Sequence, residues 1–103
     1  MIRHILFWKY TEKIKAEKKE KEALVFLQNS VATMNGKIDG LLHAQIGPNC
    51  AGGEYDLVFY AEFRDLESLK AFKDHPLHVA HRNRCQEIVT GRLCGDLVDQ
   101  EED

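Results

Sequence analysis

Apolar residues near the start of the chain predict a β-strand over residues 2–10. Leu6 and Trp8 share one face of this strand with His4, whereas Phe7 lies on the opposite face. A strand that is apolar on both faces is covered on both faces. Helices of the same chain can cover only one of them. We therefore expect a partner subunit to cover the other.

Three further segments have the composition of strands: residues 40–47, 55–63 and 91–98. The middle segment has the strongest signal, because Leu57 and Phe59 alternate with Val58 and the whole run is rich in β-forming residues. Glycine, proline and asparagine separate the first two of these segments, which is typical of a loop.

A helical pattern follows the first strand. Four apolar residues recur at intervals of three and four positions: Leu24, Leu27, Val31 and Met34. This spacing predicts the buried stripe of an amphipathic helix, which Val25 and Phe26 are expected to widen. The preceding residues 11–22 interleave lysine with glutamate, and this predicts a solvated helical face rather than a membrane or RNA patch. Asn35-Gly36 should end the helix.

A second helical region is interrupted by proline. Asp65 is a candidate N-cap for a helix over residues 66–73, with Leu66 and Phe72 on its buried face. A His-Pro pair then stops this helix, because the residue before a proline is pushed out of the helical region. A further helix is expected over residues 76–89.

The resulting order is strand, helix, strand, strand, broken helix, strand. This βαββαβ order predicts the ferredoxin-like split motif of the α+β class. A length of 103 residues fits one domain, which we assign to residues 1–98. Residues 99–103 form an acidic tail that is expected to be loose and solvated.

Composition narrows the functional classes. Hydrophobic residues make up 44% of the chain and charged residues 30%, as in soluble globular proteins. The net charge of −3 provides no electrostatic reason to expect nucleic acid. No apolar run resembles a signal segment or approaches the roughly 18 residues of a membrane span, so we expect a cytoplasmic protein. The three cysteines form no C-x-x-C pair and are expected to be reduced thiols.

Four stretches resemble the motifs of a known family: RHILFWK at residues 3–9, GPN at 47–49, YDLVFYAEF at 55–63 and a His-Pro-x-His stretch within 69–79. Together they resemble the stress-responsive α/β-barrel (Dabb) family over residues 1–98. The resemblance implies a homodimer in which two four-stranded antiparallel sheets form a shared α+β barrel. It also implies a small-molecule pocket in each subunit, between sheet and helices. Members include an enzyme that closes a linear polyketide by aldol condensation, although many have no assigned reaction.

His4 and His78 are the candidate catalytic residues, because they match two histidines that act on the substrate in the cyclase-like members. An aldol closure needs a base that takes a proton next to a carbonyl, and a donor that stabilises the enolate. Histidine can do either near neutral pH, since its ordinary pKa is about 6.5. Each also has a structural alternative: His4 at the start of a strand, and His78 in the turn after Pro76.

Two positions depart from the cyclase-like pattern. Phe72 stands where those members have a tyrosine, and Leu57 stands where they have a further pocket histidine. These replacements remove polar groups from the proton relay and leave a more apolar pocket. We expect six residues in the pocket lining: Leu6, Trp8, Leu57, Phe59, Phe72 and Cys94. The expected ligand is a small apolar or carbonyl compound, and no cofactor is expected.

A histidine repeat raises the question of a metal. His75, His78 and His81 follow an H-x-x-H-x-x-H spacing. The proline after His75 should remove it from the helix, and no closing ligand is evident, so we expect no metal site. Residues 81–84 are expected to be exposed or to lie at the pocket rim.

Two alternatives remain for the last strand, where Arg92 and Asp96 share one face: Arg92 binds an anionic ligand, or the two side chains pair with each other. For the whole chain, the sequence favours a small-molecule-binding dimeric barrel protein. The alternative is a cofactor-independent enzyme that uses His4 and His78 for acid–base chemistry of the aldol or polyketide-cyclase type. A structural assembly protein would require exposed aromatic patches, for example at Tyr60.

Overall fold

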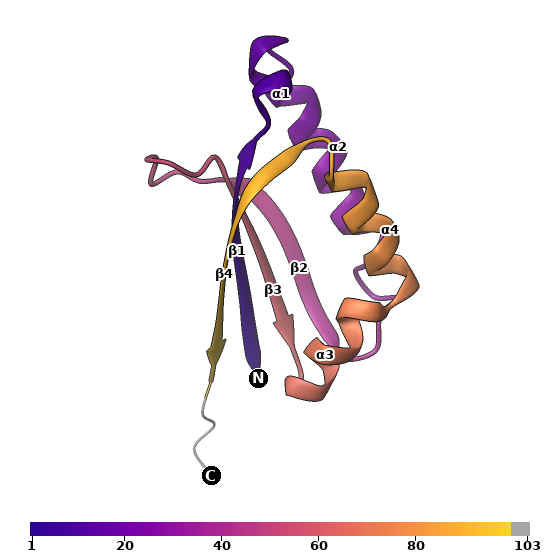
Figure 1. Cartoon of the computed structure of the whole chain (residues 1–103). Helices are drawn as coiled ribbons and strands as arrows, with labels where there is room; N and C mark the ends of the chain where they lie inside the picture. The colour runs from indigo at the N-terminus through magenta and orange to yellow at the C-terminus, as the bar shows by residue number, and fades with distance from the viewer. Residues whose placement is uncertain (100–103) are drawn as a thin grey trace.

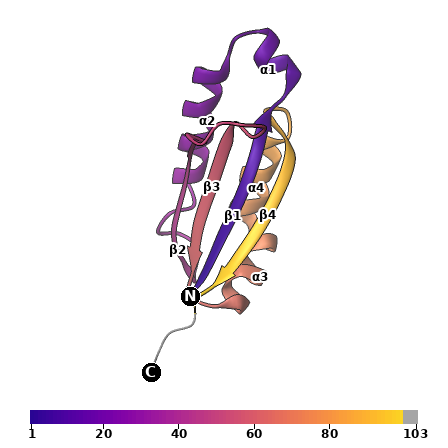
Figure 2. The same ribbon diagram turned by 90° about the vertical axis from the view of Figure 1, so that its left-hand side faces the viewer.

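The sheet has four antiparallel strands in the order β2–β3–β1–β4. In chain order the strands are β1 (Ile2–Tyr10), β2 (Leu41–Pro48), β3 (Leu57–Phe63) and β4 (Val89–Val98). The helices are α1 (Glu12–Ala16), α2 (Glu20–Ala32), α3 (Leu66–Asp74) and α4 (Pro76–Cys85). This computed structural model describes residues 1–99. Helices α2, α3 and α4 cover one face of the sheet, and the opposite face is bare (Figures 1 and 2).

This arrangement confirms the predicted ferredoxin-like βαββαβ architecture. Strand β1 spans the predicted residues 2–10 and lies between β3 and β4. Its even-numbered residues Ile2, His4 and Leu6 are buried under the helices, as the alternation predicted. The covered face of β1 therefore carries the candidate histidine into the space between sheet and helices.

The predicted first helix is divided into α1 and α2. The chain breaks between them, where Lys18 adopts a left-handed backbone conformation with φ of 56°. Val25 and Phe26 were predicted to widen the buried stripe of α2, and this was wrong: their exposed fractions are 56% and 45%. The buried stripe instead includes Ala23 and Ser30, because those positions lie on the side that faces the sheet.

Helix α3 begins as predicted. The Asp65 carboxylate accepts a hydrogen bond of 2.8 Å from the Ser68 amide and one of 2.7 Å from the Ser68 hydroxyl. Leu66 was predicted to be buried, but half of its surface is exposed. The helix turns Leu69 and Phe72 inward together with Ser68, and Leu66 falls outside this stripe.

Helix α4 ends at Cys85, before the predicted residue 89. The chain uses the intervening residues to return to the sheet. The Ile88 carbonyl accepts a hydrogen bond of 3.0 Å from the Thr11 amide, and Val89 pairs with Tyr10. Val89 therefore begins β4 instead of ending the helix.

The hydrophobic core lies between the helices and the covered face of the sheet. Its most buried side chains include Leu27 and Met34 near α2, Leu57 and Phe63 on β3, and Phe72 on α3. The Phe63 and Phe72 rings meet edge to face, with ring centroids 4.8 Å apart. This packing holds α3 against the sheet and bounds the space between the sheet and the helices.

The bare face of the sheet carries apolar side chains on neighbouring strands. Ile5 and Phe7 project from β1, and Phe7 pairs with Leu93 of β4. Leu93 and Leu97 have exposed fractions of 49% and 54%. Monomeric proteins seldom leave such a surface uncovered.

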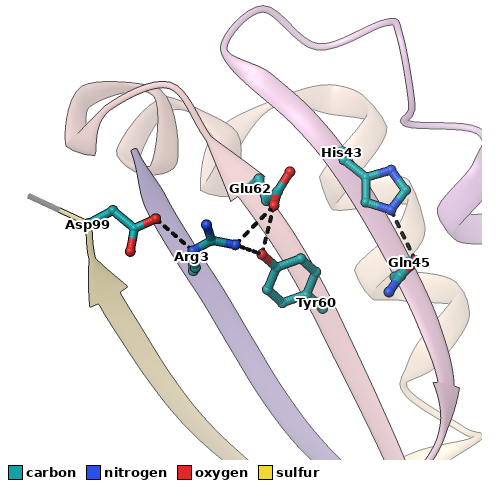
Figure 3. Close-up of polar contacts among 6 residues, drawn as sticks. All are labelled: Arg3, His43, Gln45, Tyr60, Glu62 and Asp99. Carbon is teal, nitrogen blue, oxygen red and sulfur yellow. Dashed lines mark hydrogen bonds and ion pairs between the residues drawn. The ribbon is translucent and has the colours of Figure 1, made fainter. Parts of the chain in front are cut away.

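A polar network crosses the same face near the ends of three strands (Figure 3). The Arg3 guanidinium donates to Asp99 at 2.7 Å and to the Tyr60 hydroxyl at 2.6 Å, and lies 3.2 Å from Glu62. The Tyr60 hydroxyl in turn donates to Glu62 at 2.7 Å, and this bond is the main cause of the raised pKa of Tyr60. Asp99 is thus tied to β1. The remainder of the predicted acidic tail, residues 100–103, lies outside the described residues.

Candidate functional site

A cavity of about 370 Å³ lies between strands β1 and β4 and helices α3 and α4. This volume is within the range of small-molecule pockets, roughly 300–1,000 Å³. Its apolar lining residues are Leu6, Trp8, Phe72 and Val89. Its polar lining residues are His4, His78, His81, Cys85 and Gln86, and its charged ones are Lys73, Arg82 and Arg92. The cavity is therefore apolar in part and carries three imidazoles and three cations.

Most of the site residues expected from the sequence meet at this cavity. His4, His78, Leu6, Trp8 and Phe72 all contribute to its lining.

The other three expected residues lie around the cavity and outside its lining. Leu57 and Phe59 are buried on β3, with exposed fractions of 0% and 2%. Phe59 packs behind the lining, with its ring centroid 6.2 Å from that of His4 and 6.4 Å from that of Trp8. Cys94 is exposed on β4, and its sulfur lies 3.9 Å from His4 Nδ1.

His4 is held by a carboxylate on the neighbouring strand. The register of β1 and β4 pairs His4 with Asp96, and a close hydrogen bond joins His4 Nδ1 to the Asp96 carboxylate. Because an ionised carboxylate can only accept, Nδ1 carries the hydrogen. With a hydrogen on Nδ1, the ring can accept a hydrogen bond or a proton only at Nε2, and this atom has no hydrogen-bonding partner among residues 1–99. Asp96 thus pairs with His4, and the alternative in which Arg92 pairs with Asp96 was wrong.

His78 lies in the first turn of α4, where Pro76 begins the helix. Its Nδ1 donates to the Lys73 carbonyl at 3.2 Å, since a carbonyl oxygen can only accept. The ring packs on Phe72 with centroids 4.1 Å apart. Burial lowers the pKa of His78, and the positive charges of Arg82 and Arg92 lower it further, against the opposing effect of the Lys73 carbonyl. His78 therefore also presents a basic Nε2.

His81 was predicted to be exposed or at the rim, and this was wrong, because it is only 2% exposed. Its Nδ1 lies 2.8 Å from the Ser30 hydroxyl, which accepts a hydrogen bond of 2.9 Å from Arg84. The Ser30 hydrogen is thus free to donate to Nδ1, which leaves the hydrogen of His81 on Nε2. Burial lowers the pKa of His81 to about 4, so the ring is neutral near pH 7. The i, i+3 spacing of His78 and His81 on one helix was the available sequence signal.

His75 is separate from this group. It is the N-cap of α4, and its Nδ1 accepts a hydrogen bond of 3.1 Å from the Leu77 amide. Its role is to cap the helix.

Cys85 is the buried cysteine of the site. Its sulfur lies 3.6 Å from His81 Nε2, and burial raises the pKa of its thiol to about 11. The thiol is therefore protonated at neutral pH and is a poor nucleophile.

One group of side chains in the described part of the chain has donor atoms close enough for a metal. His4 Nδ1, Cys94 Sγ and an Asp96 carboxylate oxygen all lie within 4.8 Å of one another. Nitrogen, sulfur and oxygen donors suit zinc and related ions. However, His4 and Asp96 are already bonded to each other, so an ion would have to displace that hydrogen bond. The residues fit a metal poorly, and the expectation of no metal stays a prediction.

Comparison with known proteins gives a family and a set of similar folds. The family model of the stress responsive A/B barrel domain, Dabb, matches residues 2–99. Among curated proteins, none is significantly similar to the chain. Among the described residues, no helix is both long and apolar enough to cross a membrane.

Three solved structures illustrate the similarity. A dimeric protein of unknown function with a ferredoxin-like fold from Bacteroides fragilis is 26% identical, with a TM-score of 0.78 and 93% of each chain covered. A Dabb family protein from Mesorhizobium loti is also 26% identical, with a TM-score of 0.72 and 97% of each chain covered. The hydroxynitrile lyase from Passiflora edulis is 10% identical, with a TM-score of 0.77, and covers 99% of this chain and 95% of its own. At that identity the lyase indicates a shared fold alone.

Proposed function

This chain belongs to the stress responsive A/B barrel (Dabb) family, and we propose that it binds a small, mainly apolar molecule in the cavity between β1, β4, α3 and α4. The observation that carries this proposal is the cavity itself. It has an apolar floor that includes Leu6, Trp8 and Phe72. Beside this floor lie the imidazoles of His4 and His78, whose Nε2 atoms have no hydrogen-bonding partner within residues 1–99. A ligand gains affinity from apolar burial and orientation from such polar groups.

The working unit is a homodimer joined through the bare face of the sheet. The apolar residues Ile5, Phe7, Leu93 and Leu97 on that face support this assembly. The similar Bacteroides fragilis protein is described as dimeric, which also favours it. A cytoplasmic location is consistent with three free cysteines, because reducing compartments keep thiols unpaired.

A second candidate function is cofactor-independent acid–base chemistry on a carbonyl compound. The observation that favours it is the bond between His4 and Asp96, which orients the ring and makes its Nε2 the acceptor. In an aldol step, Nε2 of His4 or His78 takes the proton from the carbon next to a carbonyl. The resulting enolate carbon then bonds to a second carbonyl carbon, and the alkoxide takes a proton back from the imidazolium.

Such a reaction also needs a hydrogen-bond donor that stabilises the enolate, and the third imidazole of the cavity can supply it. His81 presents an N–H at Nε2, which can donate a hydrogen bond to the enolate oxygen. The departures at Phe72 and Leu57 remove the tyrosine and histidine of the cyclase-like members. For this reason ligand binding is our primary proposal, and the polyketide-cyclase reaction itself is not.

Binding is tested by titrating the ¹⁵N-labelled protein with a neutral aromatic ketone, 4-phenyl-2-butanone, and following amide chemical shifts. We expect saturable shifts at Leu6, Phe72 and His78, and none at Leu93 or Leu97 on the bare face. Shifts that are absent, or that are spread evenly over both faces, would contradict a cavity-bound ligand.

Turnover is tested with the same ketone in D₂O. Acid–base chemistry predicts protein-catalysed exchange of the protons next to the carbonyl, which is lost in the folded variants His4→Gln and His78→Gln. Saturable binding without catalysed exchange would identify a binding protein, whereas exchange that survives both substitutions would remove these histidines from the reaction.

A further inference from the structure

We propose that the ligand is an organic anion, in which an apolar body of one or two rings carries a carboxylate or phosphate. This inference rests on the proposed function, because it assigns a chemical class to the ligand of the same cavity. Three cations, Lys73, Arg82 and Arg92, define what we call the cationic rim.

The first observation is that the charged residues of the cavity lining are all basic. Within residues 1–99, no aspartate or glutamate lines the cavity, although the whole chain has more acidic than basic residues and a net charge of −3. The nearest acidic group on β4, Asp96, is bonded to His4 and lies outside the lining. The cavity is therefore a local concentration of positive charge on an acidic protein.

The second observation is that these cations have no ion-pair partner in the described part of the chain. Within residues 1–99, none of the rim side chains has a carboxylate within 4 Å, and none donates a side-chain hydrogen bond. Other basic side chains behave differently: Arg3 contacts Asp99 and Glu62, and Arg64 contacts Asp39. The donors of the rim remain available to a ligand.

The third observation is that the rim is assembled by tertiary structure. Lys73 comes from the last turn of α3, Arg82 from α4 and Arg92 from β4. Arg82 and Arg92 both lie close enough to His78 for their charges to lower its pKa. Three separate elements thus bring positive charge to one opening of the cavity. A row of solvated lysines along a single helix would not converge on a cavity in this way.

The arrangement also sets how the ligand would lie. The ring system packs against Leu6, Trp8 and Phe72, and the anionic group stays at the rim. There, arginine can bind a carboxylate or phosphate through two parallel N–H donors. The imidazoles of His78 and His81 are neutral near pH 7, so they add hydrogen-bonding capacity without adding charge.

The test uses a matched pair of probes and the fluorescence of Trp8, the single tryptophan of the chain, which lines the cavity. The probes are 4-butylbenzoate and 4-butylbenzamide, which share one body and differ in charge. We expect the benzoate to bind at least tenfold more tightly, with a preference that falls as salt is raised. Titration with 4-butylphenyl phosphate then distinguishes a phosphate ligand from a carboxylate one by its relative affinity.

Two variants localise the effect. Arg82→Gln and Arg92→Gln should each weaken benzoate binding several-fold and leave benzamide binding unchanged. Lys21→Gln is the matched control, because it removes an exposed charge of α2, a helix that contributes no residue to the cavity lining, and it should keep the full preference.

Three results would overturn the inference in distinguishable ways. Equal affinity for the two probes would refute an anionic ligand and leave apolar binding in the cavity intact. A preference for benzoate that survives both arginine substitutions would refute the assignment to the rim. Absence of binding by either probe would count against the proposed function as well.

Discussion

His81 should make the protein sensitive to acid, and the direction follows from its surroundings. Its folded-state pKa is about 4 because burial disfavours the charged ring, whereas an unfolded histidine titrates near 6.5. Between these two values the unfolded chain binds more protons than the folded one. The free energy of unfolding therefore falls as the pH drops below about 6.5, and this loss levels off below about 4.

The size of the effect follows from the two pKa values. Lowering the pH from about 7.5 to about 4.5 should cost roughly 2.5 kcal/mol through His81 alone. Solvent does not weaken this effect, because only 2% of the His81 surface is exposed. For a domain of this length the loss corresponds to a fall of roughly 10–20 °C in the melting temperature.

The assay compares urea unfolding of the natural protein and His81→Gln at both pH values and one protein concentration. Glutamine keeps an acceptor for the Ser30 hydroxyl and does not titrate, so the variant should lose about 2.5 kcal/mol less on acidification. His43→Gln is the control, because His43 is exposed and bonded only to Gln45, and its pH dependence should match that of the natural protein. If His81→Gln and the natural protein lose the same stability between the two pH values, His81 is not the buried neutral ring that we describe.

Three other predictions test the fold. Gly40→Ala should lower the free energy of unfolding by about 3 kcal/mol in a urea titration, because φ at this residue is +82° and the new Cβ would lie 2.1 Å from Ser68 Oγ. Gly47→Ala is the control and should cost far less, because a Cβ at that position meets no neighbouring atom within 4 Å. Asp65→Ala should cost about 1 kcal/mol by removing the cap of α3, and an unchanged midpoint would show that the cap adds nothing. Phe7→Asp should shift the dimer towards monomer in sedimentation, whereas a natural protein that is already monomeric at micromolar concentration would refute assembly through the bare face.

Local periodicity predicted most of the secondary structure. The alternation in residues 2–10 gave both the extent of β1 and the face that carries His4. Asp65 was recognised as a cap because its side chain acts on amides only a few residues away. The errors at Val25, Phe26 and Leu66 have one cause. Apolar residues can flank a helical stripe on either side, and only packing against the sheet decides which of them are buried.

The candidate site was predictable to the extent that its residues belong to a recognisable motif. His4, His78 and Phe72 were named from the sequence, and all three line the cavity. His81 was expected to be exposed or at the rim because its burial depends on Ser30 of another helix, which its spacing from His78 does not reveal. For Asp96 the sequence offered a pair with Arg92 and did not indicate His4, because strand parity says which face a residue occupies but not which residue lies opposite.

What the sequence by itself determined was the order of elements and the α+β class, since these depend on short-range spacing. Its motifs also indicated the family and, through the resemblance to that family, two of the three cavity histidines. Only the tertiary structure decided three further features. The register of β1 and β4 brought Asp96 to His4. The packing of α4 on α2 buried His81 against Ser30. The convergence of α3, α4 and β4 gathered three cations at one opening of the cavity. Each is a contact between residues far apart in the chain, and such contacts leave no periodic signal in the sequence.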